Sequence, residues 1–215
     1  MRVVKDANER KEEILDAAQE LFIQKGFDGT STNEILDKVK IARGTLYYHF
    51  KSKEDIMDAL IERLNQQILT SASKIAGDKS ISLEEKLIRV ILSLNISGDE
   101  SKEIIEHMHK PQNALMHQKM QSKVVSGITP ILTDLVREGM EAGFFNTPYP
   151  YESIEMIMIY ANVAFDSNES YLIEEQRKNK ELAFIYHIER LLGAKEGSLK
   201  FMRNMFENRN EAYNE

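Results

Sequence analysis

Residues 14–53 have the sequence ILDAAQELFIQKGFDGTSTNEILDKVKIARGTLYYHFKSK. Their apolar residues recur every three or four positions, as they do along one face of an α-helix. The first part of this pattern predicts a helix from Glu9 to Lys25. Gly26 ends it, because glycine adopts a left-handed conformation at little cost. The chain is therefore expected to begin with an amphipathic helix that is closed by a tight turn.

Two short helices follow, separated by a three-residue turn. Ser31 and Glu34 have the spacing of a capping box, so the second helix is expected to begin at Ser31 and to end near residue 39. After the turn Lys40–Ala42, a third helix runs from Arg43 to Phe50. Two short helices at this spacing form a helix-turn-helix, whose second helix lies in the major groove of DNA.

Charge is distributed unevenly along the chain. The formal net charge is −7, which by itself argues against nucleic acid as a partner. The run from Lys38 to Lys53, however, holds five Lys or Arg residues and no Asp or Glu. DNA binding requires local positive charge rather than a basic protein as a whole. The predicted helix-turn-helix therefore carries a small basic patch on an acidic chain.

Side chains in and around the third helix suit contact with DNA. Arg43 can reach a base edge or a phosphate, Gly44 allows a close backbone approach, and Thr45 offers a hydroxyl and a methyl group to a base edge. Phosphate oxygens accept hydrogen bonds from hydroxyl, imidazole and ammonium groups. The residues predicted to donate to phosphates are Thr32, Tyr47, Tyr48, His49 and Lys53.

A solvated helical segment with scattered lysines is the alternative interpretation, and for isolated lysines it is the usual one. Here the basic run, the paired tyrosines and the spacing of the two short helices coincide in one stretch. Their coincidence favours a DNA-binding surface.

This stretch also resembles the N-terminal domain of the tetracycline-repressor (TetR/AcrR-like) family. The resemblance rests on LF…KGF at 21–27, on the Glu-Ile pair that follows Ser31 and Thr32, and on GTLYYHF-K-x-K at 44–53. It implies an all-helical protein whose regulatory domain dimerises through its last major helices. It also implies that the DNA-facing positions are Thr32, Ile41, Ala42, Arg43, Gly44, Thr45, Tyr47, Tyr48, His49 and Lys53.

Two positions depart from the family pattern. Many relatives have glycine where Lys40 stands, and a left-handed conformation there would cost lysine roughly 1 kcal/mol relative to glycine. Either the turn differs slightly or Lys40 adds a phosphate contact, so Lys40 joins the DNA-binding candidates. Ala42 replaces a frequent serine and removes a possible hydroxyl contact. These two positions are where the DNA specificity of this chain is expected to differ.

The remainder of the chain also has helical periodicity, which predicts an all-α fold. Ser52 is a plausible N-cap for a long fourth helix that reaches about residue 75, long enough to connect two domains. We expect residues 1–53 to form the DNA-binding domain and residues 54–215 to form a larger regulatory domain for ligand binding and dimerisation.

Two later helices, predicted at 151–165 and 176–192, are apolar around much of their circumference. Such helices are buried on several sides. They either pack within one subunit or form a two-fold four-helix interface. We expect the interface, because a homodimer matches a DNA site made of two half-sites.

The middle of the regulatory domain contains methionines interspersed with polar side chains. Flexible, polarizable side chains suit a pocket for apolar or aromatic compounds, although they suit an ordinary core equally well. The candidate pocket residues are Met108, Asn113, Met116, His117, Met120 and Asn162.

Neither a metal site nor a catalytic site is expected. The potential metal ligands are Glu103, Glu106, His107, His109 and His117. Pro111 separates His117 from the others, and helical spacing points His107 and His109 in different directions, so the side chains do not converge. The chain contains no cysteine, no glycine-rich phosphate loop, no Gly-x-Ser-x-Gly and no His-Glu-x-x-His. No metal, cofactor or catalytic residue is therefore predicted.

The sequence predicts a ligand-responsive transcriptional regulator. We expect a repressor that a small apolar or aromatic inducer releases from a palindromic operator. A cytoplasmic location is expected because the chain has neither an apolar run of ~18 residues nor a signal-peptide core at its start. The competing hypotheses are an enzyme, for which motifs are missing, and a helical adaptor that has lost DNA binding. The intact basic run argues against the adaptor.

Overall fold

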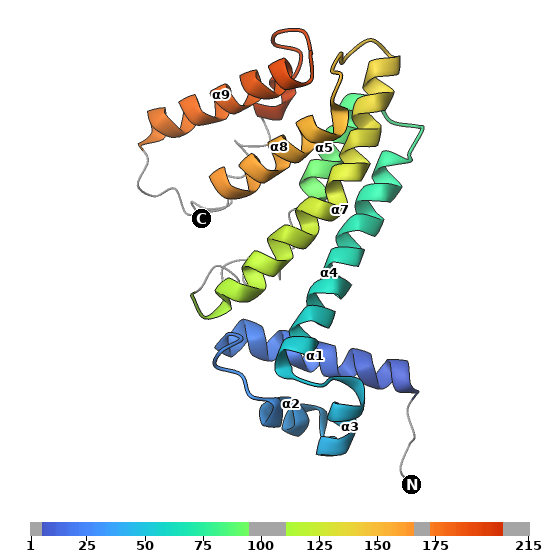
Figure 1. Cartoon of the computed structure of the whole chain (residues 1–215), viewed down its shortest axis with the longest axis vertical. Coiled ribbons are helices and arrows are strands. Elements are labelled where there is room, and N and C mark those ends of the chain that lie inside the picture. The colour runs from blue at the N-terminus through green and yellow to red at the C-terminus, as the bar shows by residue number, and fades with distance from the viewer. Residues whose placement is uncertain (1–5, 95–110, 166–172, 204–215) are drawn as a thin grey trace. The chain divides into compact units, whose positions relative to one another are not determined.

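The computed structural model describes residues 6–94, 111–165 and 173–203, and these residues form helices and no strands (Figure 1). The all-α prediction is thereby confirmed. The short turns of 3-10 helix are η1 (Pro111–Asn113) and η2 (Lys200–Met202). The α-helices are α1 (Ala7–Lys25), α2 (Thr32–Val39), α3 (Arg43–His49), α4 (Lys53–Ala76), α5 (Leu83–Leu94), α7 (Ala114–Glu141), α8 (Pro150–Ala164) and α9 (Glu174–Leu191).

Local sequence signals set where several of these helices begin. Ser52 accepts a hydrogen bond from the amide of Asp55 at 3.0 Å, as predicted for the N-cap of α4. Ser82 likewise accepts one from the amide of Glu85 at 3.2 Å, just before α5. The predicted bounds of α8 and α9 agree with the structure to within two residues. The sequence also predicts a short helix at residues 101–110, which lies outside the described residues.

The described residues belong to two compact units. The first contains residues 6–67 and 111–123, and the second contains 68–94, 124–165 and 173–203. Helices α4 and α7 each contribute their first part to the first unit and the remainder to the second. The boundary between residues 53 and 54, drawn from the sequence as a functional boundary, stays a prediction.

The first unit is built around the helix-turn-helix. Helix α2 packs against both α1 and α3. Helix α4 is joined to α1 by Arg63, which pairs with Glu12 at 2.9 Å and Asp16 at 2.7 Å. The large side chains of this unit that are fully buried include Ile14, Leu15, Phe22, Ile35, Leu46, Ile56, Met57, Leu60 and Ile61. This core fixes the position of the two short helices on α1 and α4, and leaves their other faces in solvent.

Within the same unit, the first turns of α7 run beside the first turns of α4. Lys119 pairs with Asp58 at 2.5 Å, and Lys123 pairs with Glu62 at 2.8 Å. Exposed ion pairs of this kind contribute little stability. They show, however, that the two helices run in the same direction here.

The second unit has its own apolar core, contributed by α4, α5, α7, α8 and α9. On its α8–α9 side, the ring of Phe184 lies 5.4 Å from that of Tyr160 and 5.1 Å from that of Phe165. Lys180 donates to the carbonyl of Ala164 at 2.5 Å. Helices α8 and α9 are therefore packed side by side within one subunit.

Within the described ranges, no helix is both long enough and apolar enough to cross a membrane. In those ranges, moreover, no three His, Asp or Glu side chains gather closely enough to hold a metal ion. His107 and His109 lie outside the described residues.

Candidate nucleic-acid interface

The turn between α2 and α3 has a left-handed residue at Lys40. Its backbone angles are φ 58° and ψ 47°, and it is the only residue other than glycine with positive φ among those described. The amide of Ile41 donates back to the carbonyl of Leu36 at 3.2 Å, which closes the end of α2. The sequence left open whether the turn differs at Lys40. The structure has the left-handed conformation there, which costs lysine about 1 kcal/mol relative to glycine.

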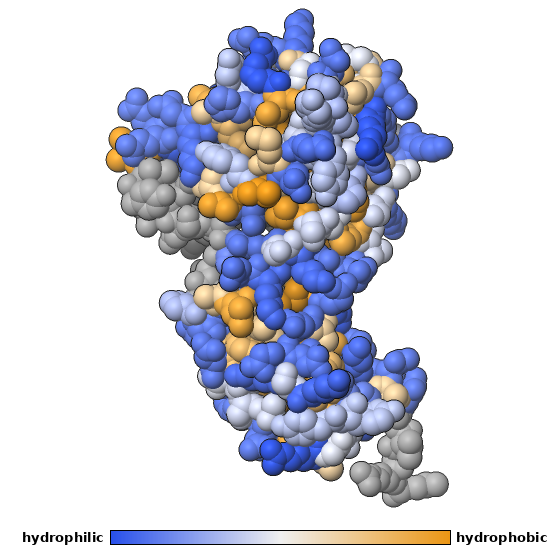
Figure 2. All heavy atoms as spheres, viewed as in Figure 1, coloured by the Kyte–Doolittle hydropathy of each residue, from blue (hydrophilic) through white to orange (hydrophobic). Residues whose placement is uncertain are grey.

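The predicted DNA-binding residues all lie at the surface or partly exposed. Tyr48 is 79% exposed, and a Cβ added at Gly44 would meet no atom within 4 Å. Arg43 and Tyr47 are also exposed, whereas Leu46 and Phe50, on the other side of α3, are buried. Figure 2 shows that the part of the α2–α3 surface in view is mainly hydrophilic. Helix α3 therefore presents an open polar face, as a recognition helix requires.

Side chains from both short helices meet on this face. The pKa of the Tyr47 hydroxyl is lowered because the side chains of Arg43 and Thr32 both hydrogen-bond to it. The guanidinium carbon of Arg43 also lies 5.6 Å from the centre of the Tyr47 ring. Thr32 is the first residue of α2, so the start of α2 and the start of α3 belong to one continuous surface.

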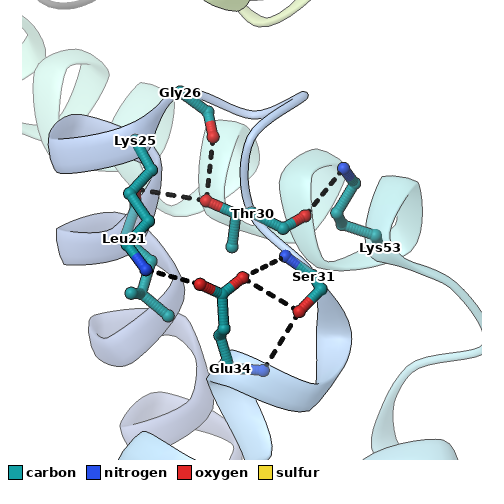
Figure 3. A network of polar contacts seen from close by, with 7 residues as sticks. All are labelled: Leu21, Lys25, Gly26, Thr30, Ser31, Glu34 and Lys53. Carbon is teal, nitrogen blue, oxygen red and sulfur yellow. Dashed lines mark hydrogen bonds and ion pairs between the residues drawn. The ribbon is translucent and has the colours of Figure 1, made fainter.

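The start of α2 is held by the capping box predicted from the sequence. The amide of Glu34 donates to the Ser31 hydroxyl at 3.3 Å, and the Ser31 amide donates to the Glu34 carboxylate at 2.8 Å. Lys25, at the end of α1, adds an ion pair with Glu34 at 2.5 Å (Figure 3). These contacts lower the pKa of Glu34 from 4.5 to about 2, the Lys25 hydrogen bond being the largest cause.

Glu34 therefore makes the stability of the first unit depend on pH. The pKa of Glu34 is lower in the folded chain than in the unfolded chain. Its contribution to the free energy of unfolding is therefore fully present above pH 4.5 and is lost as the pH falls towards about 2. We expect Glu34→Gln to lower the thermal midpoint at pH 6, and we expect the difference from the wild type to shrink progressively below pH 4.5. Thermal melts followed by circular dichroism at a series of pH values would measure it. A difference that stays constant down to pH 2 would contradict this assignment.

Lys53 takes a different position from the one expected of a phosphate-binding residue. Its ammonium donates to the carbonyls of Phe27 at 2.6 Å and Thr30 at 2.9 Å. It also lies 4.2 Å from the centre of the Phe27 ring. The structure thus gives the ammonium acceptors inside its own domain.

The candidate pocket residues fall into different environments. Met116 and Met120 are buried, and His117 is partly buried with its Nε2 3.2 Å from the amide nitrogen of Gln121. Asn162 lies in α8, in the second unit, and Met108 lies outside the described residues. A pocket formed by these residues stays a prediction.

Asn113 has a structural task that the sequence did not reveal. Its side chain is 2% exposed, accepts a hydrogen bond from the amide of Phe27 at 2.7 Å, and donates to the carbonyl of Phe22 at 3.3 Å. The end of α1 is therefore tied to the start of α7. The carboxamide of Asn113 thus has partners within the first unit, and its assignment to a ligand pocket stays a prediction.

One buried polar residue was missed by the sequence analysis. Asn65 is 4% exposed, and its Oδ1 has no hydrogen-bond partner in the described part of the chain. It occupies a core position of α4, between Ile61 and Ile68 on the buried stripe. The signal was an amide in a run of apolar positions at helical spacing.

The geometry is that of a helical DNA-binding regulator: one compact unit carries an exposed recognition helix, and a second, larger unit is also helical. The family described as bacterial regulatory proteins, tetR family, matches residues 14–60, and the tetracyclin repressor-like C-terminal domain matches residues 97–187. The chain belongs to the tetR family of bacterial transcriptional regulators, which are not enzymes.

Individual relatives agree with this assignment. The chain is 28% identical over 134 residues to the fatty acid metabolism regulator protein of Bacillus subtilis, covering 61% of this chain and 68% of the relative. It is 37% identical over 92 residues to the regulator AcrR of Shigella flexneri, covering 41% and 43%.

Solved structures share the fold. Salmonella enterica GusR superposes with a TM-score of 0.59 at 18% identity, covering 89% of this chain and 99% of that one. The regulator FadR from Bacillus subtilis, in complex with stearoyl-CoA, superposes with a TM-score of 0.52 at 22% identity, covering 73% and 89%.

Proposed function

We propose that the chain is a repressor that binds a palindromic DNA operator as a homodimer and releases it when a small apolar ligand binds. The observation that carries the DNA-binding part is the meeting of Thr32, Arg43 and Tyr47 on one exposed face. On that face a guanidinium and two hydroxyls from two helices lie together, beside the protruding Tyr48. Arginine reads guanine edges, and hydroxyls donate to phosphates.

The remaining predicted contacts extend the same surface. Lys40, Ile41, Ala42, Gly44, Thr45 and His49 lie along the turn and α3, and none of them is buried. We place the base-reading groups at the start of α3 and the phosphate-binding groups around it.

A homodimer through α8 and α9 is the second part of the proposal. These helices bury one side in their own core and leave large apolar side chains on the other. Val163 is 73% exposed, and Figure 2 shows apolar side chains at the surface of the unit that contains α8 and α9. The further exposed members of this apolar face are Met156, Ile159, Tyr160, Leu182 and Tyr186. A second copy of the chain is the occupant that a two-fold operator calls for.

The effector is proposed to be apolar, with a polar group that meets the protein. The buried Met116 and Met120 suit a hydrocarbon, and the Oδ1 of Asn65 offers an acceptor that lacks a partner in the described residues. Two matches from Bacillus subtilis support this class: a protein described as a regulator of fatty acid metabolism, and the structure of the regulator FadR with stearoyl-CoA. Long-chain acyl compounds are therefore the first effectors to test.

Selection of bound DNA from a random pool tests the proposal. We expect the wild type to enrich a two-fold symmetric sequence, and Arg43→Ala/Tyr48→Ala to bind that sequence at least about 30-fold more weakly. Arg137→Ala/Tyr149→Ala is the matched control, since it removes the same two residue types from exposed positions elsewhere. Unchanged operator binding by the Arg43/Tyr48 variant would refute the proposed interface.

Repeating the selection with added ligands tests the effector. Enrichment should fall when an acyl compound of the right length is present. If no apolar compound changes operator affinity, the inducer part of the proposal fails while the DNA-binding part stands.

A further inference from the structure

A buried threonine in the loop between α1 and α2 hydrogen-bonds to the end of α1. Thr30 is 2% exposed, and its hydroxyl donates to the carbonyl of Gly26 at 2.8 Å, with the carbonyl of Leu21 a second acceptor at 3.2 Å (Figure 3). Both acceptors belong to the last turn and the end of α1. The loop is thereby fastened to the helix that precedes it.

Lys53 hydrogen-bonds to two backbone carbonyls of the same loop. Its ammonium, which lies at the start of α4, donates to the carbonyls of Phe27 and Thr30 and rests against the Phe27 ring. The Phe27 ring is itself buried and packs on Phe22 at 5.3 Å between ring centres. An ammonium has three N–H donors, so two of them are committed to the loop.

The residue that Lys53 holds is adjacent to the DNA-facing surface. Thr30 precedes Ser31, the N-cap of α2, and Thr32 is the first residue of that helix. Thr32 reaches Tyr47 on the recognition helix. The chain of contacts therefore runs from Lys53 through the Thr30 carbonyl to the start of α2, and from there to the surface proposed to bind DNA.

We propose that Lys53 acts on DNA binding as a positioning residue, which fixes the start of α2 against the DNA backbone, and does not itself neutralise a phosphate. This inference rests on the proposed DNA interface. It departs from the interpretation suggested by the sequence, in which Lys53 donates to a phosphate.

The dependence of affinity on salt distinguishes the two roles. A lysine that neutralises a phosphate releases condensed counterions, so its loss reduces the slope of log affinity against log salt concentration by about 0.9. A lysine that only positions other groups changes the affinity and leaves the slope as it was. We would measure Lys53→Met on the selected operator and on a random duplex over a range of KCl concentrations.

We expect Lys53→Met to bind the operator about tenfold more weakly with the wild-type slope. Lys74→Met is the matched control, since it removes the same charge from an exposed position of the same helix, outside the basic run at 38–53. A slope lowered by about 0.9 in Lys53→Met, or an unchanged affinity, would overturn the proposal. Lys53→Gln, which retains two N–H donors without the charge, should recover part of the affinity.

A double-mutant cycle with Thr32→Val separates positioning from a general loss of stability. If Lys53 acts through the start of α2, Lys53→Met should weaken binding by less than about threefold once the Thr32 hydroxyl is gone. If the two residues made independent contacts, or if the variants merely lost folded protein, the fold-losses of affinity from the two substitutions would multiply. That result would overturn the proposal. Circular dichroism melts of each variant establish that the proteins compared are folded. Absence of any DNA preference in the wild type would overturn the proposed function first, before any variant is compared.

Discussion

Val163→Glu/Leu182→Glu is expected to convert the proposed homodimer into a monomer that binds the operator at least about 100-fold more weakly than the wild type. Both side chains lie on the exposed apolar face of α8 and α9. In a two-fold interface the same patch meets itself, so each added carboxylate is buried opposite apolar groups or other carboxylates. Burying unpaired charges costs several kcal/mol.

The loss of operator affinity follows from the loss of the second half-site. A dimer that holds one half-site presents its second reading helix at a high effective concentration, which a monomer lacks. Light scattering after size-exclusion chromatography would give the oligomeric state, and fluorescence anisotropy would give the affinity.

Leu92→Glu is the control for this variant, because it makes the same apolar-to-acid change at an exposed leucine of α5. It should leave both mass and operator affinity at wild-type values. If the Val163/Leu182 variant remained a dimer at micromolar concentration while Leu92→Glu became monomeric, the interface would involve α5 and not α8 and α9.

The helix-turn-helix could be predicted from sequence because its signals are local. The Ser31–Glu34 capping box spans four residues, and both of its hydrogen bonds are present. At Lys40 the sequence marked the position of interest but left open whether the turn differs, and the structure has a left-handed backbone there. In each case a short stretch of backbone and its own side chains determine the conformation, so no distant contact is needed.

The roles of Lys53 and Asn113 could not be predicted in the same way. Lys53 bonds a carbonyl 26 residues away, and Asn113 bonds an amide 86 residues away. A basic residue beside a recognition helix suggests phosphate binding from the sequence alone, and an amide among methionines suggests a pocket. Only tertiary packing shows that both side chains are engaged with the segment around Phe27.

Asn113→Leu is expected to destabilise the first unit by about 2 kcal/mol, because the buried amide of Phe27 loses its acceptor. The carbonyl of Phe22 is less affected, since it also accepts from the amide of Gly26 at 2.9 Å. Leucine has the same number and branching of side-chain heavy atoms as asparagine but no polar atom, so the substitution opens no cavity and removes the hydrogen bonds. Urea unfolding would measure it, with Gln112→Ala, at the exposed neighbouring position, as control.

The same substitution should also weaken communication between effector and operator. Asn113 joins the start of α7 to the end of α1, and the end of α1 leads through the Thr30 loop to the start of α2. An effector that moves the start of α7 would therefore displace the DNA-facing surface through this side chain. The factor by which an effector lowers operator affinity is typically about 5–150. In folded Asn113→Leu we expect this factor to fall well below its wild-type value, while a factor equal to that of the wild type would show that the signal travels by α4 alone.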